Sequence, residues 1–419
     1  MVFYFYLFIF LLNIGLFRIP ARPVYVVSYV ILFVLTLPAY LHQRKVLVKH
    51  FQSFRVFELT LICFLAYFSI RILFDESDSK WGSVVNLMEV LPYGIFFPTV
   101  AVLNNIKNVN TFVKFGLMVA IIGSFLCLAQ SFYGLSPMFN IEWYHTGAWS
   151  GNKDMLGPFA RVNLPISSWI IFCFLWLVTY SLAKLKPSYI LMSSIFFAVI
   201  LLAQFRSLWL ALTLSLSIEV FIYAYFFKDI LKTSYKFFFI LLLIVTLLFF
   251  MLKIIGGHQL LTEFSFERLG QGYYDVLFSS GTFGSRLLTM TIGQDLLEDN
   301  FWFGSGYMFY YYGNMPFLVD VGYIYVSVLL GVVGLTLVLT LFVSQLASGC
   351  ELLRLKMFDH NNPLTFLPLA TIGYAMTLFI YQHWLIPYST PNIAIAMALS
   401  FNFYSLKLNH LDNINTQSS

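Results

Sequence analysis

Two arginines, Arg206 and Arg286, are the residues of this sequence best suited to chemistry. Arg206 lies where two apolar segments meet, and Arg286 opens a predicted helix inside a long, more polar segment. A guanidinium stays charged and grips a phosphate through paired hydrogen bonds, so both are candidates for anion binding. The alternatives to anion binding are that Arg206 extends its charge to the membrane surface and that Arg286 forms an ordinary salt bridge.

Acidic and histidine side chains supply the candidates for proton transfer. Asp320 stands at the mouth of a later apolar segment, where it could accept a proton from a sugar hydroxyl or simply cap a helix. Glu89 and Glu219 fall inside apolar segments. Each could be a coupling-ion or proton site, or a packing residue held by hydrogen bonds. His145 and His383 fall between such segments and could bind substrate or act as bases.

Several kinds of site are missing from the sequence. It has no Cys-x-x-Cys or Cys/His cluster and no paired Asp-x-Asp, so neither a metal nor a cofactor is expected. It also has no P-loop, GxSxG or HExxH. A transfer reaction here would therefore use a donor that is already activated when it arrives.

The composition says which elements must position these residues. Of the 419 residues, 60% are hydrophobic and only 10% are charged, and the mean hydropathy is +0.82. A soluble domain carries about 25% charged residues. The apolar run 237–252 lacks the alternation that a membrane barrel requires. The sequence therefore predicts an all-α polytopic membrane protein, with residues 1–419 forming a single integral membrane domain.

Twelve apolar segments have the length and composition of membrane spans. Met1–Phe17 reads as an uncleaved first span rather than a removable signal. Arg206 marks a break between two spans, because a single helix there would far exceed one bilayer crossing. The segments are 2–17, 24–41, 56–74, 83–103, 112–133, 164–183, 188–205, 207–227, 237–255, 321–346, 364–382 and 393–406.

The distribution of cations predicts the orientation. Fourteen of the 24 lysines and arginines collect in alternate short loops and the tail, which favours cytoplasmic termini. Two long loops, 134–163 and 256–320, then face outward, and the polar tail 408–419 is predicted to be disordered. Within the larger loop, 285–298 has the spacing of an amphipathic helix, which Gly304-Ser305-Gly306 should end.

Four motifs resemble the O-antigen ligase and polysaccharide polymerase (WaaL/Wzy-like) family of bacterial membrane glycosyltransferases. The first, Gly151–Gly157, is similar to the Lys-Asn-x-Leu-Gly block that starts a middle span in that family, with Asp154 in the Asn position. The other three are Phe205-Arg206-Ser207; Gly284-Ser285-Arg286 with Asp299 and Phe303-Gly304-Ser305-Gly306; and Asp320–Ile324 with Gly331-Val332-Val333-Gly334. The resemblance covers roughly residues 145–340.

The resemblance implies a GT-C-like fold and an inverting, metal-independent transfer of a glycan from undecaprenyl pyrophosphate. Arg206 and Arg286 would hold the pyrophosphate and stabilise charge on the leaving group, with Asp320 near the acceptor hydroxyl. Ligases of the family usually place a histidine near the Asp320 position, so the departure favours a polymerase over a ligase. Further substrate contacts are expected from Lys153, Arg161, Arg268, His145 and His383.

The expected function is therefore polymerisation of O-antigen or exopolysaccharide repeat units on the outer face of the bacterial cytoplasmic (inner) membrane. Expected partners are the lipid-linked glycan, membrane lipid, a chain-length regulator and a flippase, with no nucleic acid. An O-antigen ligase acting on lipid A-core is the alternative within the family. The alternative from another class is a lipid-linked oligosaccharide flippase or a secondary transporter, which would show repeats and broken helices.

Overall fold

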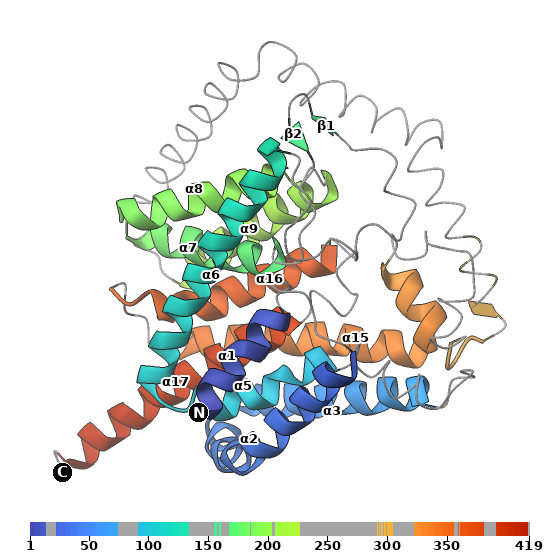
Figure 1. Ribbon diagram of the computed structural model, residues 1–419. Coiled ribbons are helices and arrows are strands. Elements are labelled where there is room, and N and C mark those ends of the chain that lie inside the picture. The colour runs from blue at the N-terminus through green and yellow to red at the C-terminus, as the bar shows by residue number, and fades with distance from the viewer. Residues whose placement is uncertain are drawn as a thin grey trace.

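The described part of the chain is helical apart from one pair of two-residue strands. The computed structural model describes residues 1–13, 22–73, 91–133, 155–156, 159–160, 167–184, 186–202, 206–226, 291, 293, 295, 297–298, 300–304, 322–355, 359, 361–380 and 391–417. The elements, drawn in Figure 1, are α1 (Val2–Asn13), α2 (Arg22–His50), α3 (Gln52–Leu73), η2 (Leu91–Ile95), α5 (Phe96–Val102), α6 (Ile106–Tyr133), β1 (Met155–Leu156), β2 (Phe159–Ala160), α7 (Ser167–Ala183), α8 (Pro187–Leu202), α9 (Arg206–Phe226), α15 (Gly322–Arg354), η6 (Pro363–Phe366), α16 (Leu367–Ile380) and α17 (Pro391–Gln417).

Five of these helical segments are long and apolar enough to cross a membrane. They lie in α2, α3, α6, α15 and the continuous pair η6 and α16. Apolar runs of this length form helices because a helix satisfies its own backbone hydrogen bonds where no water is present. The predicted all-helical membrane protein is confirmed at this level. Each predicted segment overlaps a described helix along the sequence, except 237–255, which lies outside the described residues.

Helices α3 and α15 form an antiparallel pair that is tied at both ends (Figure 1). At one end, the Glu351 carboxylate of α15 accepts hydrogen bonds from the backbone N–H groups of Gln52 and Ser53, at 3.1 and 3.0 Å. These are the first residues of α3, whose N–H groups have no partner within the helix. At the other end, Tyr67 and Arg71 of α3 bind backbone carbonyls of and beside α15.

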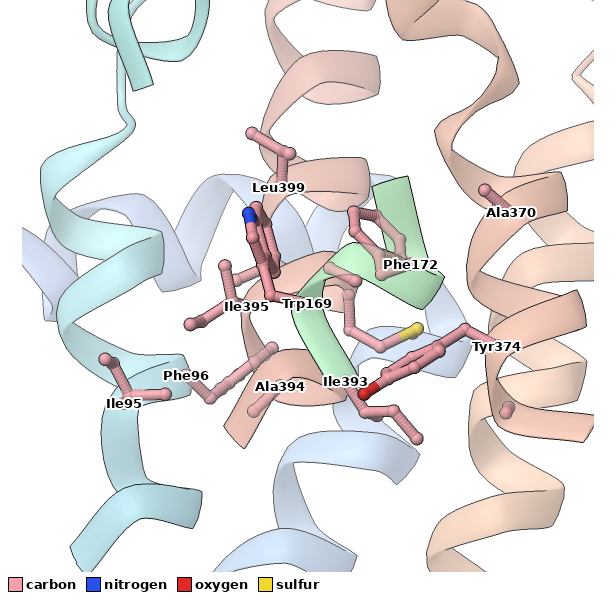
Figure 2. Close-up of a cluster of buried hydrophobic side chains, with 14 of the residues drawn as sticks. Ile95, Phe96, Trp169, Phe172, Ala370, Tyr374, Ile393, Ala394, Ile395 and Leu399 are labelled. Carbon is pink, nitrogen blue, oxygen red and sulfur yellow. The ribbon is translucent and has the colours of Figure 1, made fainter. Parts of the chain in front are cut away.

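A second set of helices packs around α16. Helix α9 lies along α16, α7 contacts α8 and α16, and α17 contacts α5 and α16. Figure 2 shows side chains from η2, α5, α7, α16 and α17 meeting in one buried cluster, with the Trp169 ring near its centre. The Trp169 indole N–H donates to the Gly116 carbonyl at 2.9 Å, so this large side chain is buried without an unpaired polar atom.

Most buried polar side chains in these helices have a local partner. Glu58, which is 2% exposed, accepts from Tyr40 and pairs with the Arg44 guanidinium at 2.5 Å. Thr99, Ser124 and many other hydroxyls donate to the carbonyl four residues earlier in their own helix. Such bonds make polar residues tolerable inside an apolar bundle.

Two places near helix ends bear on the sequence predictions. Helix α8 ends at Leu202 and α9 begins at Arg206, and residues 203–205, where the predicted division falls, lie outside the described residues. Helix α17 continues to Gln417, whereas the polar composition of 408–419 predicts disorder. A helix that is already nucleated by an apolar span adds one hydrogen bond for each further residue, which explains the extension.

Candidate functional site

Helix α15 is broken at Gly331, nine residues after its start. Gly331 has φ +66° and ψ −171°, a backbone conformation that side chains other than glycine rarely adopt. A break of this kind removes intrahelical partners from nearby N–H and C=O groups. The groups around Gly331 find their partners in the segment Asn300–Gly304, which lies beside the break. We call Tyr67, Arg71, Asn300–Gly304 and Leu330–Val333 the loop–helix junction.

Backbone hydrogen bonds join the two halves of the loop–helix junction. The N–H of Val332 donates to the Phe301 carbonyl at 3.0 Å, and the N–H of Val333 donates to the Trp302 carbonyl at 3.3 Å. Within the returning segment, the Gly304 N–H donates to the Asn300 carbonyl at 2.8 Å. Residues 300–304 therefore supply the acceptors that the broken helix lacks.

Two glycines allow the backbones of the loop–helix junction to touch. A Cβ on Gly304, where φ is +73°, would lie 2.5 Å from the Gly331 nitrogen, and a Cβ on Gly331 would overlap the Trp302 carbonyl. The described helical residues before the junction stop at Glu298, ahead of Gly304, and Asn300–Phe303 form a turn that leads to Gly304. Because backbone atoms of the opposite segment fill the space that a Cβ would need at either glycine, neither can be replaced without moving backbone.

Helix α3 fastens the loop–helix junction through two side chains one turn apart. The Tyr67 hydroxyl donates to the Leu330 carbonyl at 2.6 Å and lies 3.4 Å from the Phe303 carbonyl. The Arg71 Nη2 donates to the Gly304 carbonyl at 3.0 Å. Both side chains therefore act on backbone that the break in α15 and the turn at Gly304 leave without regular partners.

The loop–helix junction brings together parts of two motifs that the sequence holds almost thirty residues apart. Phe303-Gly304 belongs to the block within the predicted large loop, and Gly331-Val332-Val333-Gly334 belongs to the block predicted to leave that loop. Their contact was not predicted, and neither were the roles of Tyr67 and Gly331. The signal that could have suggested it is the occurrence of glycine in both blocks, since close backbone approach requires glycine.

Of the predicted site residues, only Arg206 lies in the described part of the chain. It is the first residue of α9, where the helix dipole favours an anion. Outside the described residues lie Arg286 and Asp320, together with Lys153, Arg161, Arg268, His145 and His383. Their roles and their mutual distances stay predictions.

Only the last part of the Gly151–Gly157 block lies in the described part of the chain. Met155–Leu156 pairs with Phe159–Ala160 as a short antiparallel hairpin, β1 and β2, and β2 packs against α6. The following helix, α7, begins only at Ser167.

Glu219 is a second polar feature of the described bundle. It is fully buried on α9 against Gly373 of α16, and neither carboxyl oxygen has a hydrogen-bond partner among the described residues. Ser215 lies one turn before Glu219 on α9, and its hydroxyl accepts a hydrogen bond from the Thr377 hydroxyl of α16 at 2.9 Å. Glu89, the other acid predicted inside a span, lies outside the described residues.

The described helices offer little space for a substrate. A cavity of about 20 Å³ lies between α3, α15 and α17, and its lining is apolar apart from Tyr93 and Gln345. That volume suits one water rather than a sugar. Among the described residues, no group of His, Cys, Asp and Glu could hold a metal ion.

The described geometry is a scaffold at the end of α3 that holds residues 300–304 against the broken part of α15. No known protein-family model matches this chain, and no curated protein sequence matches it.

Proposed function

We propose that this chain is a membrane glycosyltransferase that polymerises lipid-linked oligosaccharide repeat units. In this proposal twelve spans cross the bacterial inner membrane, and the loops 134–163 and 256–320 face outward. The observation that carries it is the loop–helix junction, because two blocks of the family-like pattern meet there through backbone hydrogen bonds. A loop that brings catalytic residues to a lipid-linked donor needs such a fixed point on the membrane domain.

The proposed reaction transfers the growing glycan from undecaprenyl pyrophosphate to an acceptor sugar hydroxyl with inversion. The hydroxyl oxygen forms the new bond to the anomeric carbon, while the bond to the pyrophosphate oxygen breaks and the pyrophosphate leaves as an anion. Arg206, at the N-terminus of α9, and Arg286 would stabilise that developing charge. Asp320 would accept the hydroxyl proton.

The arginine assignment is tested by the variants Arg206→Ala and Arg286→Ala in cells that make the polysaccharide. Loss of a preorganised cationic group costs about 100-fold to 1,000-fold in rate, so long chains should disappear from gels while the protein still inserts in the membrane. Chains of normal length in both variants would overturn the assignment. Asp320→Asn tests the base separately, and activity within a few-fold of wild type would leave Asp320 as a helix cap.

A secondary transporter is the second candidate, and two described features favour it. Glu219 is an acid buried inside the bundle, and α15 is broken, as helices at transporter binding sites are. The break, however, lies about 20 residues from Glu351, close to one membrane boundary rather than the midplane. Purified protein given lipid-linked repeat units separates the two, because only an enzyme lengthens them without a second compartment.

A further inference from the structure

Arg71, near the end of α3, is a cation whose charge the described residues do not neutralise. Its Nη2 donates to the neutral Gly304 carbonyl, while its Nε is buried and has no partner among those residues. A guanidinium offers five N–H donors. Arg44 on α2 shows the contrast, since it pairs with the Glu58 carboxylate at 2.5 Å. Within the part of the chain that the structure describes, no carboxylate lies within ion-pair distance of Arg71.

Two independent helices place Arg71 near a membrane boundary. On α15, the stretch from Gly331 to Glu351 covers about 20 residues and rises about 30 Å, which is the thickness of the hydrocarbon core. On α3, the stretch from Ser53 to Arg71 rises about 27 Å in the opposite direction. No charged residue lies between Gly331 and Glu351 or between Glu58 and Arg71. Because Ser53 and Glu351 are bonded at one boundary, the loop–helix junction lies at the other.

Exposed aromatic side chains lie next to Arg71 at this level. Phe301, Trp302 and Phe303 are 47%, 62% and 60% exposed, although their backbone is held firmly on α15. The exposed apolar side chains of Ile70 and Leu73 continue this surface along α3. Aromatic rings of this kind are enriched where hydrocarbon meets lipid headgroups.

We propose that Arg71 and the Phe301–Phe303 aromatics form a binding site for the phosphate of a membrane lipid. The anions present at a hydrocarbon boundary are lipid phosphates, and arginine binds them through paired, charge-assisted hydrogen bonds. The rings lie against the upper part of the lipid chain. The phosphate belongs either to an anionic phospholipid or to a polyprenyl lipid, and both present the same chemistry to the guanidinium.

The test measures lipid affinity of the purified full chain by native mass spectrometry. The protein in detergent is titrated with phosphatidylglycerol, undecaprenyl phosphate or phosphatidylcholine. Wild type should bind the first two more tightly than the third, and Arg71→Gln should lower affinity for them about tenfold. Tyr67→Phe is the matched control, because it removes a junction hydroxyl one turn away and keeps the cation, so its affinities should equal those of wild type.

The outcomes separate the two lipid sources and the proposed reaction. Arg71 dependence for undecaprenyl phosphate alone identifies a site for a polyprenyl lipid, and equal dependence for both anionic lipids identifies a phospholipid site. Equal affinities of wild type and Arg71→Gln for every lipid overturn the proposal. If Arg71→Gln fails to fold, Arg71→Lys replaces it with an expected loss of about threefold, since lysine contacts phosphate as a point charge; unchanged affinity then overturns the proposal. The loss caused by Arg71→Gln should be the same in an Arg206→Ala background, even where Arg206→Ala itself weakens binding of undecaprenyl phosphate, so failure of the glycosyltransferase proposal leaves this result intact.

Discussion

Gly331 is the residue on which the loop–helix junction depends most directly, because its backbone conformation and its missing side chain are both required. Its positive φ opens α15, and its bare Cα lets the Trp302 carbonyl approach. Gly304 meets the same two requirements from the other side. The close backbone contact in the loop–helix junction therefore depends on two residues that have no side chain.

Alanine at Gly331 or Gly304 should destabilise the protein by about 2–5 kcal/mol. A left-handed conformation costs a side chain about 1–2 kcal/mol, and displacing backbone from a packed contact costs about 1–3 kcal/mol. The thermal midpoint in detergent measures the loss. Gly94→Ala is the control, because a Cβ there meets nothing within 4 Å, and its midpoint should stay near that of wild type. Equal midpoints for all three variants would contradict the close contact.

At the scale of elements, the pairing of α3 with α15 explains how a broken helix keeps its position. Glu351 caps the N-terminus of α3 at one end, and Tyr67 and Arg71 hold the loop–helix junction at the other. Between these contacts both helices present apolar side chains to each other and to lipid. Two helices tied at both ends cannot slide along each other without breaking polar contacts.

Removal of the Glu351 carboxylate should weaken this pairing measurably. Glu351→Ala leaves the first N–H groups of α3 without their acceptor, and loss of an N-terminal cap costs about 0.5–2 kcal/mol. Glu351→Gln keeps one acceptor oxygen and should lose less. Thermal unfolding of the two variants beside wild type gives the comparison. A midpoint for Glu351→Ala equal to that of wild type would show that the cap adds nothing to stability.

At the scale of the whole molecule, the polar contacts between helix ends in the described part of the chain form two groups. Lys184 binds Asn361 at 2.5 Å, so the ends of α7 and η6 lie together. The loop–helix junction gathers the end of α3, the broken part of α15 and residues 300–304. The predicted orientation assigns the first group to the cytoplasm and the second to the exterior.

Cysteine labelling tests this orientation. Asn300 and Asn361 are both exposed, so each can be replaced by cysteine in a chain whose four native cysteines are substituted. A membrane-impermeant maleimide should label Asn300→Cys in intact cells and Asn361→Cys only after permeabilisation. Labelling of both positions in intact cells would show that the two groups do not lie on opposite sides of the membrane.

The glutamates illustrate how much of the bundle could be predicted. Glu219 was expected inside a span from its apolar neighbours, and it is buried there. That it rests on Gly373 without a hydrogen bond could not be predicted, because α9 and α16 are far apart in the chain. The ion pair between Glu58 and Arg44 could not be predicted either, because it depends on how α2 packs against α3.

The sequence by itself determined that this chain is helical and built for a membrane, because hydrocarbon excludes water and every apolar run must satisfy its backbone internally. It also predicted a span that starts near Arg206, where α9 begins, because a helix start has a local sequence pattern. Only the tertiary structure decided that Arg44 is neutralised by Glu58 while Arg71 holds the Gly304 carbonyl. The physical reason is that a cation's partner depends on which helices pack together, and residues 233 positions apart carry no local pattern that says so.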